Sequence, residues 1–250
     1  MSNKSEIKYV DIHTHAYPEK IAAKAVAFVG THYEFGEIPN GGTMDALEAN
    51  ARAGGHAHVV VFGTATRPDQ VYNVNTWMGG AVADKRCFTG FGTIHRDYDK
   101  FEEEIDRIIS LGLKGIKLHA DFQGFNIDDP KMYPIYEAIG ERLPVMMHVG
   151  DEKLDYAHPR RVANVIRDFP KMTVIAAHMG GYSRWKEANE YLVGKNVFFD
   201  TSSTLFKMDF DEAADMMRRH GIEKIMFGTD YPIITQKEEL EKIMSSRRKD

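Results

Sequence analysis

Asp11-Ile12-His13-Thr14-His15 follows the short apolar run of residues 7–10 and is the most informative stretch of the chain. Alternate residues of a β-strand face the same way, so His13 and His15 project from one side with Cα atoms about 6.6 Å apart. Two imidazoles at that spacing can bind one divalent cation from the same side. A single His-x-His pair is weak evidence, because histidines also lie near one another by chance.

Other apolar, strand-like runs end in residues of the same chemical kind. These ends are Lys117-Leu118-His119, Met147-His148, Ala177-His178 and Phe227-Gly228-Thr229-Asp230. Histidines and an aspartate that recur at strand ends indicate a metal site.

The order of strands and helices predicts the fold. Helical patterns fill the gaps between eight strand-like runs, which lie near residues 7–13, 58–63, 87–93, 115–119, 144–149, 172–177, 196–200 and 224–228. This alternation favours βαβ units with a parallel sheet, and the chain has the usual length of one (β/α)8 barrel. We therefore expect the α/β class, with a single TIM barrel domain over residues 1–250.

The first connection, residues 16–57, is longer than the others and predicts a helical insertion after strand 1. One helix opens at Pro18, and Thr43 caps a second helix, which Gly54-Gly55 ends. On a barrel this insertion rises over the face at which the strands end. Three residues between the helices can contact a substrate there, although packing is the simpler role for each: His32, Tyr33 and Phe35.

Composition and charge disfavour several classes of function. The net charge of -5 lacks the excess of positive charge that binding to nucleic acid or to an anionic membrane needs. No apolar run is long enough to span a bilayer, and the polar residues 1–8 lack the core of a signal peptide. The single cysteine, Cys87, fits a reducing compartment, and its apolar neighbours predict a buried structural thiol within a strand. We expect a cytoplasmic protein that acts on a small molecule, either alone or as a homo-oligomer.

Barrel geometry separates the histidines, because only the C-terminal ends of the strands point at the active face. Six of the eleven histidines occupy such ends: His13, His15, His95, His119, His148 and His178. His56 and His58 also form a His-x-His pair, but they precede their strand at the opposite face. We therefore expect that this pair does not bind the metal. His220, in the last turn of a helix, and His158, before Pro159, are assigned structural roles.

Asp230 follows the last strand and precedes Tyr231-Pro232. Its carboxylate can bind the metal and accept a proton from water. Imidazole and carboxylate ligands suit Zn²⁺ best, and also Mn²⁺ or Fe²⁺. Bound zinc lowers the pKa of water to about 7, which permits hydrolysis without a nucleophilic side chain.

Taken in order, the motifs resemble the amidohydrolase superfamily, in particular the amidohydrolase-2 branch that includes aminocarboxymuconate semialdehyde decarboxylase. The resemblance covers nearly the whole chain and rests on Asp11-x-His13-x-His15, Gly115-Ile116-Lys117-Leu118-His119, Pro144-Val145-Met146-Met147-His148, His158-Pro159, Ala177-His178-Met179-Gly180-Gly181 and Phe227-Gly228-Thr229-Asp230-Tyr231-Pro232. It implies a distorted barrel with one divalent metal held by His13, His15, His148 and Asp230. It also implies that His178 polarises the substrate or activates the water, with Asp230 as its catalytic partner.

The chain departs from the family pattern in two places. Binuclear relatives use a carboxylated lysine on strand 4 as a ligand that bridges two metal ions. This chain has Lys117 and His119 there, so the sequence leaves open whether a second metal ion binds. An ordinary interior lysine is the simpler role for Lys117, and His119 is the better candidate for the site. The chain also ends at residue 250 without the further C-terminal helix common in the family, which suggests a truncated or replaced end.

Three more residues are candidates for the second metal or for the substrate. They are His95, and also Arg96 and Arg184, which follow strands 3 and 6 and can pair with a substrate carboxylate. Isolated surface arginines are, however, more often solvated. The expected reaction is hydrolysis of a small carboxylate, amide or lactone. The alternative on the same metal is non-oxidative decarboxylation of a small aromatic or unsaturated acid, and the sequence does not choose because both reactions use the same ligands.

Three other classes of protein fit less well. TatD-like nucleases place a metal-binding glutamate on strand 4, where this chain has Lys117 and His119, and the acidic charge does not favour a phosphate backbone. PHP-type phosphoesterases carry a late Asp-x-His, where Asp230-Tyr231-Pro232 stands here. A non-catalytic barrel is least favoured, since structural zinc sites are usually closed and cysteine-rich.

Overall fold

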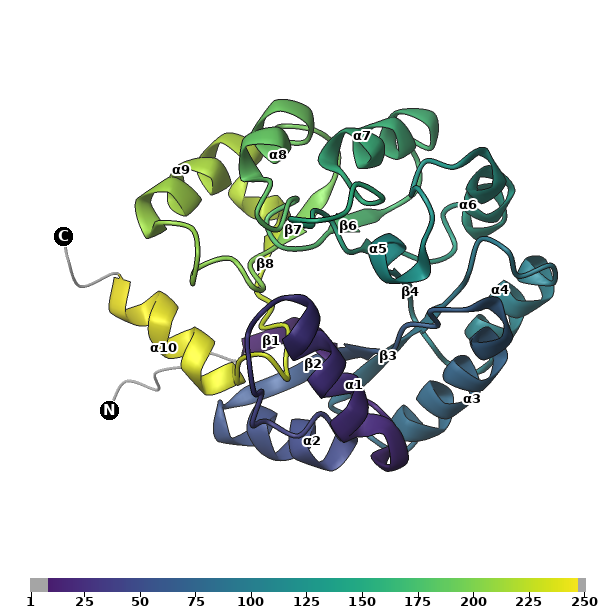
Figure 1. Ribbon diagram of the computed structural model, residues 1–250, viewed down its shortest axis with the longest axis horizontal. Helices are drawn as coiled ribbons and strands as arrows, with labels where there is room; N and C mark the ends of the chain where they lie inside the picture. The colour runs from purple at the N-terminus through teal and green to yellow at the C-terminus, as the bar shows by residue number, and fades with distance from the viewer. Residues whose placement is uncertain (1–8, 247–250) are drawn as a thin grey trace, which may run out of the picture.

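The strand that carries the histidine pair is the first of eight parallel strands in one sheet. The computed structural model describes residues 9–246, and its strands are paired in chain order from β1 to β8. Their bounds are β1 Tyr9–His15, β2 His56–Phe62, β3 Phe88–Thr93, β4 Ile116–Leu118, β5 Val145–Met147, β6 Val174–Ala176, β7 Phe198–Asp200 and β8 Ile225–Met226. The predicted α/β fold, a (β/α)8 barrel, is confirmed (Figure 1).

Helices connect the strands and surround them (Figure 1). The α-helices are α1 Glu19–His32, α2 Met44–Ala53, α3 Val71–Val82, α4 Phe101–Ser110, α5 Ala120–Gln123, α6 Tyr133–Ile139, α7 Pro159–Asp168, α8 Trp185–Tyr191, α9 Phe210–His220 and α10 Gln236–Ser246. Three short 3-10 turns are η1 Pro68–Gln70, η2 Pro130–Met132 and η3 Ile222–Lys224. The predicted start of the first strand at residue 7, the polar residues 1–8 and the last residues 247–250 lie outside the described part of the chain.

Backbone hydrogen bonds join the two edges of the sheet just beyond β8. The Ile12 N–H donates to the carbonyl of Phe227 over 3.0 Å, and the Asp230 N–H donates to the carbonyl of His13 over 2.8 Å. The His15 N–H donates to the carbonyl of Tyr231 over 2.7 Å. The segment that closes the barrel therefore carries Asp230, and closure itself brings this carboxylate beside the histidine pair.

Apolar side chains pack on both faces of the sheet. One buried cluster contains Phe62, Phe91, Met146, Ile175 and Ala177. A larger cluster contains Val145 and Met147 together with buried residues of the surrounding helices. Because alternate strand residues face opposite sides, Met146 points into the barrel and the residue two positions on, His148, has the same direction.

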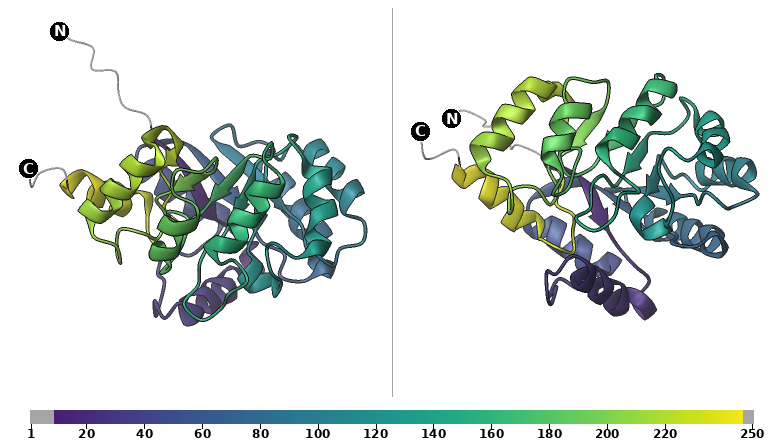
Figure 2. Two further views of the ribbon diagram at one scale, coloured as in Figure 1. Left: turned by 90° about the horizontal axis from the view of Figure 1, so that it is seen from above. Right: turned by 45° about the horizontal axis from the view of Figure 1, so that its top comes forward.

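The predicted insertion after strand 1 is confirmed as the two helices α1 and α2. The Thr43 hydroxyl accepts the N–H of Ala46 over 3.2 Å and so caps α2, which ends at Ala53 with Gly54 as its C-cap, as expected. α1, in dark purple, stands out from the ring of helices in Figure 2. It follows the C-terminal end of β1, so it lies on the side of the barrel where functional side chains gather.

The structure corrects two sequence-based expectations. Cys87 is exposed rather than buried, because β3 begins one residue later and Cys87 ends the polar turn that contains Lys85 and Arg86. His56 lies inside β2 rather than before it, as its first residue. It pairs with Tyr9, whereas Phe62 pairs with His15, so His56 and His58 do lie at the opposite end of the barrel from the histidine pair.

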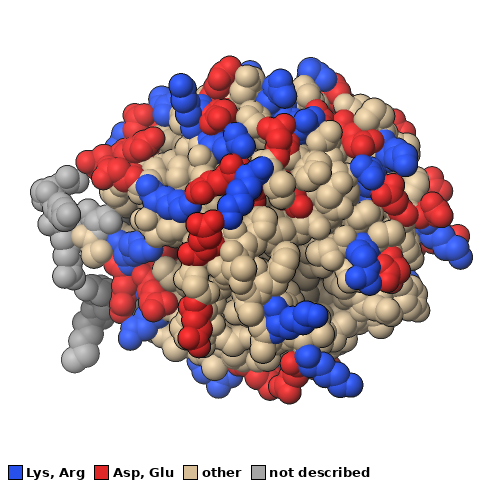
Figure 3. Space-filling view, viewed as in Figure 1, with Lys and Arg blue, Asp and Glu red and all other residues tan. Residues whose placement is uncertain are grey.

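The surface is mixed in charge. In the face shown in Figure 3, acidic and basic side chains are interspersed and separated by uncharged areas. Among the described residues no helix combines the length and the apolar character needed to cross a membrane.

Candidate metal centre

Three of the four predicted ligands meet at one point. Nε2 of His13 lies 3.4 Å from Oδ1 of Asp230, and Nε2 of His15 lies 3.2 Å from the same oxygen. Ligand atoms around a tetrahedral zinc ion, with bonds of about 2.0–2.1 Å, stand about 3.4 Å apart. The spacing and the chemistry of His13, His15 and Asp230 therefore fit one divalent ion, and this trio is one of three groups in the described residues that could hold a metal.

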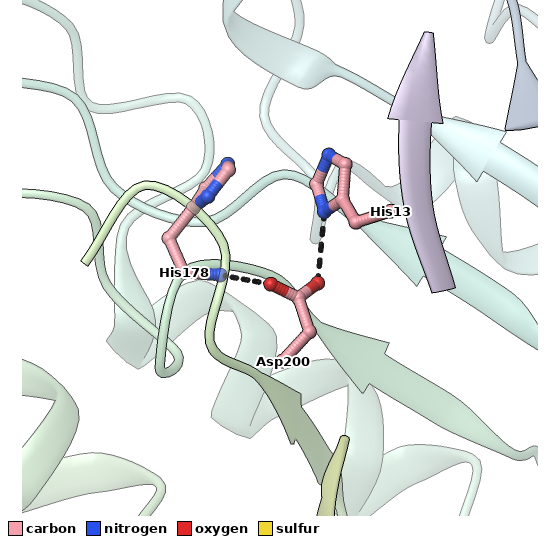
Figure 4. Close-up of side chains that lie close together, drawn as sticks. All are labelled: His13, His178 and Asp200. Atoms are coloured by element: carbon pink, nitrogen blue, oxygen red, sulfur yellow. Dashed lines mark hydrogen bonds and ion pairs between the residues drawn. The ribbon is translucent and has the colours of Figure 1, made fainter. Parts of the chain in front are cut away.

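Asp200, at the end of β7, holds the first of these histidines in place. Its Oδ2 lies 2.8 Å from Nδ1 of His13, and its Oδ1 accepts the backbone N–H of His178 over 3.2 Å, as Figure 4 shows. The Ser202 N–H also donates to Oδ1, over 2.9 Å. A carboxylate on Nδ1 fixes the tautomer in which Nε2 carries the lone pair, which is the form a metal ligand needs.

The charges of the trio suit a cation. Burial, followed by the nearby Lys117 ammonium, lowers the pKa of His13 to about 3, so its ring is neutral at physiological pH. Burial also lowers the pKa of His15, against the opposing effect of Asp230. Burial alone would raise the pKa of Asp230, but the facing histidines outweigh it and hold this pKa well below its usual range. Neutral imidazoles beside an ionised carboxylate are ready to bind a divalent ion.

His148, the fourth predicted ligand, stands beside this trio rather than within it. Its Nδ1 lies 2.9 Å from Nε2 of His178, and its Nε2 lies 2.7 Å from the carbonyl of Gly150. It belongs to a second potential metal group, together with His119 and Asp121. The His148 and His119 rings are stacked, with centroids 3.9 Å apart.

His178 bridges the metal trio and His148. Its Nδ1 lies 2.9 Å from the Ser202 hydroxyl and 4.0 Å from Oδ2 of Asp230. Oδ2 of Asp230 also accepts a hydrogen bond from the Ser203 hydroxyl over 2.6 Å. The structure therefore places the predicted catalytic pair, His178 and Asp230, side by side in a buried position.

Lys117 is fully buried inside the barrel, as its strand parity predicts. Its Nζ lies 3.3 Å from Nε2 of His13 and 4.6 Å from the centre of the Phe62 ring. Burial lowers the pKa of Lys117 to about 8, against the opposing charges of Asp230 and Asp200. The ammonium is thus adjacent to the metal trio, whereas His119 lies next to His148.

The insertion reaches the site through Tyr33. Its hydroxyl lies 3.2 Å from Nε2 of His148 and 3.3 Å from Nε2 of His119. His32 instead pairs with Asp151 over 2.9 Å, and Phe35 packs against the Phe206 ring. These two residues therefore attach the insertion to the loops that follow β5 and β7.

Three predicted candidates lie elsewhere. Both ring nitrogens of His95 contact backbone groups, the carbonyl of Gln123 at 3.2 Å and the N–H of Asp97 at 3.1 Å. Arg96 pairs with Asp97 and Asp129. Arg184 donates to the backbone carbonyl of Asp151 over 2.8 Å. None of the three lines the cavity described next.

A cavity of about 780 Å³ opens from the metal centre to the surface. His15, His119, His148 and Asp230 line its inner end, together with Tyr33. Most of the remaining lining is apolar or aromatic and comes from α1, from the connection after β2 and from α3. A concave apolar site with a few converging polar groups is the usual form of a small-molecule binding site.

The sequence interpretation missed Asp200 and the two serines that follow it. Asp200 ends an apolar strand in the same way as the predicted ligands do, and this signal could have identified it. Ser202 and Ser203 stand two and three residues further along the chain and hydrogen-bond to His178 and Asp230 respectively.

The histidines and aspartates gather at the C-terminal ends of the strands, which is the face where (β/α)8 barrel enzymes carry their active sites. The family model for amidohydrolases matches residues 10–245. The chain therefore belongs to the amidohydrolase family and is an enzyme of the amidohydrolase superfamily.

Solved structures share the fold at low sequence identity. A probable 2-pyrone-4,6-dicarboxylic acid hydrolase from Acinetobacter baumannii, with citric acid bound, superposes with a TM-score of 0.68 at 14% identity, covering 96% of this chain and 92% of that one. An amidohydrolase from Burkholderia multivorans, with bound HEPES, gives a TM-score of 0.65 at 13% identity, covering 97% of this chain and 93% of that one. At these identities the likeness concerns the fold alone.

Proposed function

We propose that this enzyme is a metal-dependent hydrolase that cleaves a small ester, lactone or amide at the metal centre. The observation that carries the proposal is the meeting of His13, His15 and Asp230, with Asp200 fixing the tautomer of His13. Neutral imidazoles and an ionised carboxylate at this spacing are the ligand types and the geometry that a divalent cation needs.

Zn²⁺ is the metal that these ligands favour, and Mn²⁺ or Fe²⁺ are the alternatives. Bound there, such an ion would polarise a carbonyl group and lower the pKa of water. His148, whose Nε2 contacts the carbonyl of Gly150 beside the trio, would be the fourth ligand.

The chain's own residues provide the proton chemistry. Asp230 is held ionised and would accept a proton from the attacking water; its Oδ2 accepts a hydrogen bond from the Ser203 hydroxyl and lies 4.0 Å from Nδ1 of His178. The Ser202 hydroxyl and the contact with His148 fix the orientation of the His178 ring. His178 is buried, and Asp230 lies at the inner end of the cavity, where a bound ligand would cover it.

A lactone is the first substrate type to test. The Acinetobacter baumannii neighbour is named for hydrolysis of a 2-pyrone dicarboxylic acid, and a 2-pyrone is a cyclic ester. Ester and amide hydrolysis need the same polarised carbonyl, so the panel includes simple aryl esters, amides and lactones, together with aromatic acids and single-stranded DNA.

Metal analysis followed by this panel tests the proposal. Protein purified without chelator should contain about one equivalent of a divalent metal and should hydrolyse at least one carbonyl compound. Two outcomes would overturn the proposal. One is a metal content far below one equivalent that added Zn²⁺ or Mn²⁺ does not raise; the other is release of CO₂ from an aromatic acid with no hydrolysis of any panel member.

A pair of double variants links the activity to the site. His13→Gln with His15→Gln should abolish metal binding and hydrolysis together, because two ligands disappear. His56→Gln with His58→Gln is the matched control, since it removes a His-x-His pair from the far end of the neighbouring strand. It should leave metal content and turnover near the wild-type values. Loss of metal from this control, with the fold intact by circular dichroism, would show that the metal lies elsewhere.

A further inference from the structure

The cavity above the metal centre is a slot between two helical faces. Its lining includes four residues of α1 and four of η1 and α3: Ile21, Lys24, Ala25 and Phe28, and Gln70, Asn73, Val74 and Trp77. Each set has the i, i+3, i+4, i+7 spacing of residues that share one side of a helix. One set comes from α1 and the other from η1 and α3, so two regular helical faces contribute to the lining of the slot.

The α1 face leaves large apolar side chains uncovered. Ile21 is 49% exposed and Phe28 is 56% exposed, although both line the cavity. α1 buries its other face, which carries Ala22, Val26 and Gly30. Exposed apolar groups that are gathered in the wall of a cavity provide surface for a ligand to cover.

A cation lies on the same face. Lys24 is exposed and stands between Ile21 and Phe28, and within the described residues no hydrogen bond or ion pair engages its ammonium group. The other cation of the lining, Arg67, is already held by Asp69 through contacts of 3.0 and 2.9 Å. His148 and Asp230 at the inner end are buried, whereas Lys24 is exposed, so Lys24 lies toward the open end of the slot.

We propose that this slot binds an amphipathic anion, with its apolar body against Phe28 and Trp77 and its acidic group on Lys24. The volume of about 780 Å³ lies within the usual range of about 300–1,000 Å³ for drug-sized ligands. The inference rests on the proposed function in one respect: if the ligand is the substrate, its reactive carbonyl lies at the buried end. The enzyme would then act on aryl or acyl compounds that carry an acid group far from the bond that is cleaved.

Two fluorescent probes separate the apolar from the anionic contribution. 8-Anilinonaphthalene-1-sulfonate carries a sulfonate, and N-phenyl-1-naphthylamine has the same ring system without it. The full-length protein should bind one equivalent of each probe and should bind the sulfonate more tightly. Added salt should weaken only the sulfonate complex, because an exposed charge contact is screened.

Single substitutions assign the two contributions to residues. Lys24→Gln should weaken sulfonate binding about two- to fivefold, the range for an exposed charge pair, and should leave the neutral probe unchanged. Phe28→Ala should weaken both probes. Lys20→Gln is the matched control, since Lys20 lies on the same helix and does not line the cavity; it should change neither affinity.

The proposal is overturned if the wild-type protein binds neither probe, or binds the sulfonate no more tightly than the neutral probe. Equal effects of Lys24→Gln and Lys20→Gln would overturn it too, because the dye would then report general positive charge. These measurements need no metal and no turnover. An active hydrolase that fails them keeps its proposed function and loses only the assigned ligand class, whereas an inactive protein that passes them keeps the binding site.

Discussion

At the residue scale, the centre depends on the carboxylate of Asp200, which contacts the His13 ring on the nitrogen that does not face Asp230. Asp200 binds Nδ1 of His13 and the backbone of His178, so it positions one ligand and one catalytic candidate at once. Although burial opposes ionisation, His13 and the neighbouring groups lower the pKa of Asp200 to about 2. Its negative charge therefore persists throughout the pH range in which His13 is neutral, and it makes Nε2 of His13 a stronger ligand.

Asp200→Asn tests this role. The amide can still accept the hydrogen bond but lacks the charge, so we expect metal affinity to fall about 10- to 100-fold, as is usual for such outer partners. Competition with a chromophoric chelator measures the affinity.

Asp209→Asn is the control for this substitution. Asp209 caps α9 and lies outside the site, and asparagine caps a helix as well as aspartate does. Wild-type metal affinity in Asp200→Asn would contradict the assigned role. Thermal unfolding of both variants in chelator shows whether the effect is specific to the metal.

At the scale of elements, a buried amide connects α3, β3 and α4. Oδ1 of Asn75 accepts the N–H of Thr93 over 2.7 Å, and its Nδ2 donates to the carbonyl of Thr93 over 2.9 Å. The same Nδ2 donates to Glu104 over 2.7 Å, and Arg107 pairs with the Glu104 carboxylate. The backbone N–H and C=O of Thr93, the last residue of β3, are thus both hydrogen-bonded by one helix side chain.

Asn75→Ala should lower the free energy of unfolding by about 2–4 kcal/mol, because it leaves buried backbone and carboxylate groups without partners. Urea denaturation measures the change. Asn196→Ala, at an exposed position, should stay within about 0.5 kcal/mol of wild type. Similar losses in both variants would mean that the Asn75 hydrogen bonds contribute little.

At the scale of the whole molecule, the segments that close the barrel are the same ones that carry His13, His15 and Asp230. The residues that bond β1 to the segment after β8 flank Asp230 and the histidine pair. A ligand that bridges His13, His15 and Asp230 therefore holds together the first and last parts of the barrel, and it should stabilise the native state as any ligand specific to that state does.

Added Zn²⁺ should raise the melting temperature of chelator-treated protein. At a free metal concentration of about 100 times Kd, the stabilisation is about 2.7 kcal/mol, or roughly 5–10 °C for a chain of this size. Differential scanning fluorimetry measures the shift. The double variant His13→Gln with His15→Gln should show none, and an equal shift in that variant would place the stabilising ion elsewhere.

The sequence predicts the barrel well, because apolar runs of strand length alternate with helices and end in ligand-type residues. It places His13, His15, His178 and Asp230 correctly at one face for the same reason. It cannot identify Asp200 as a partner of His13, because that contact spans 187 residues and depends on how the barrel closes. It also cannot show that local backbone groups occupy both nitrogens of His95, since strand position fixes where a side chain starts and not its rotamer.

The exposed Cys87 provides a single point of attachment at the end of the barrel opposite the candidate metal centre. It is the only cysteine, and it directly precedes β3, whereas the catalytic end lies beyond the last residue of that strand. Six residues of strand separate the two ends by about 20 Å. A maleimide-coated support would therefore capture every molecule through the same atom and in the same orientation, with the slot directed towards the solution and free to admit its ligand.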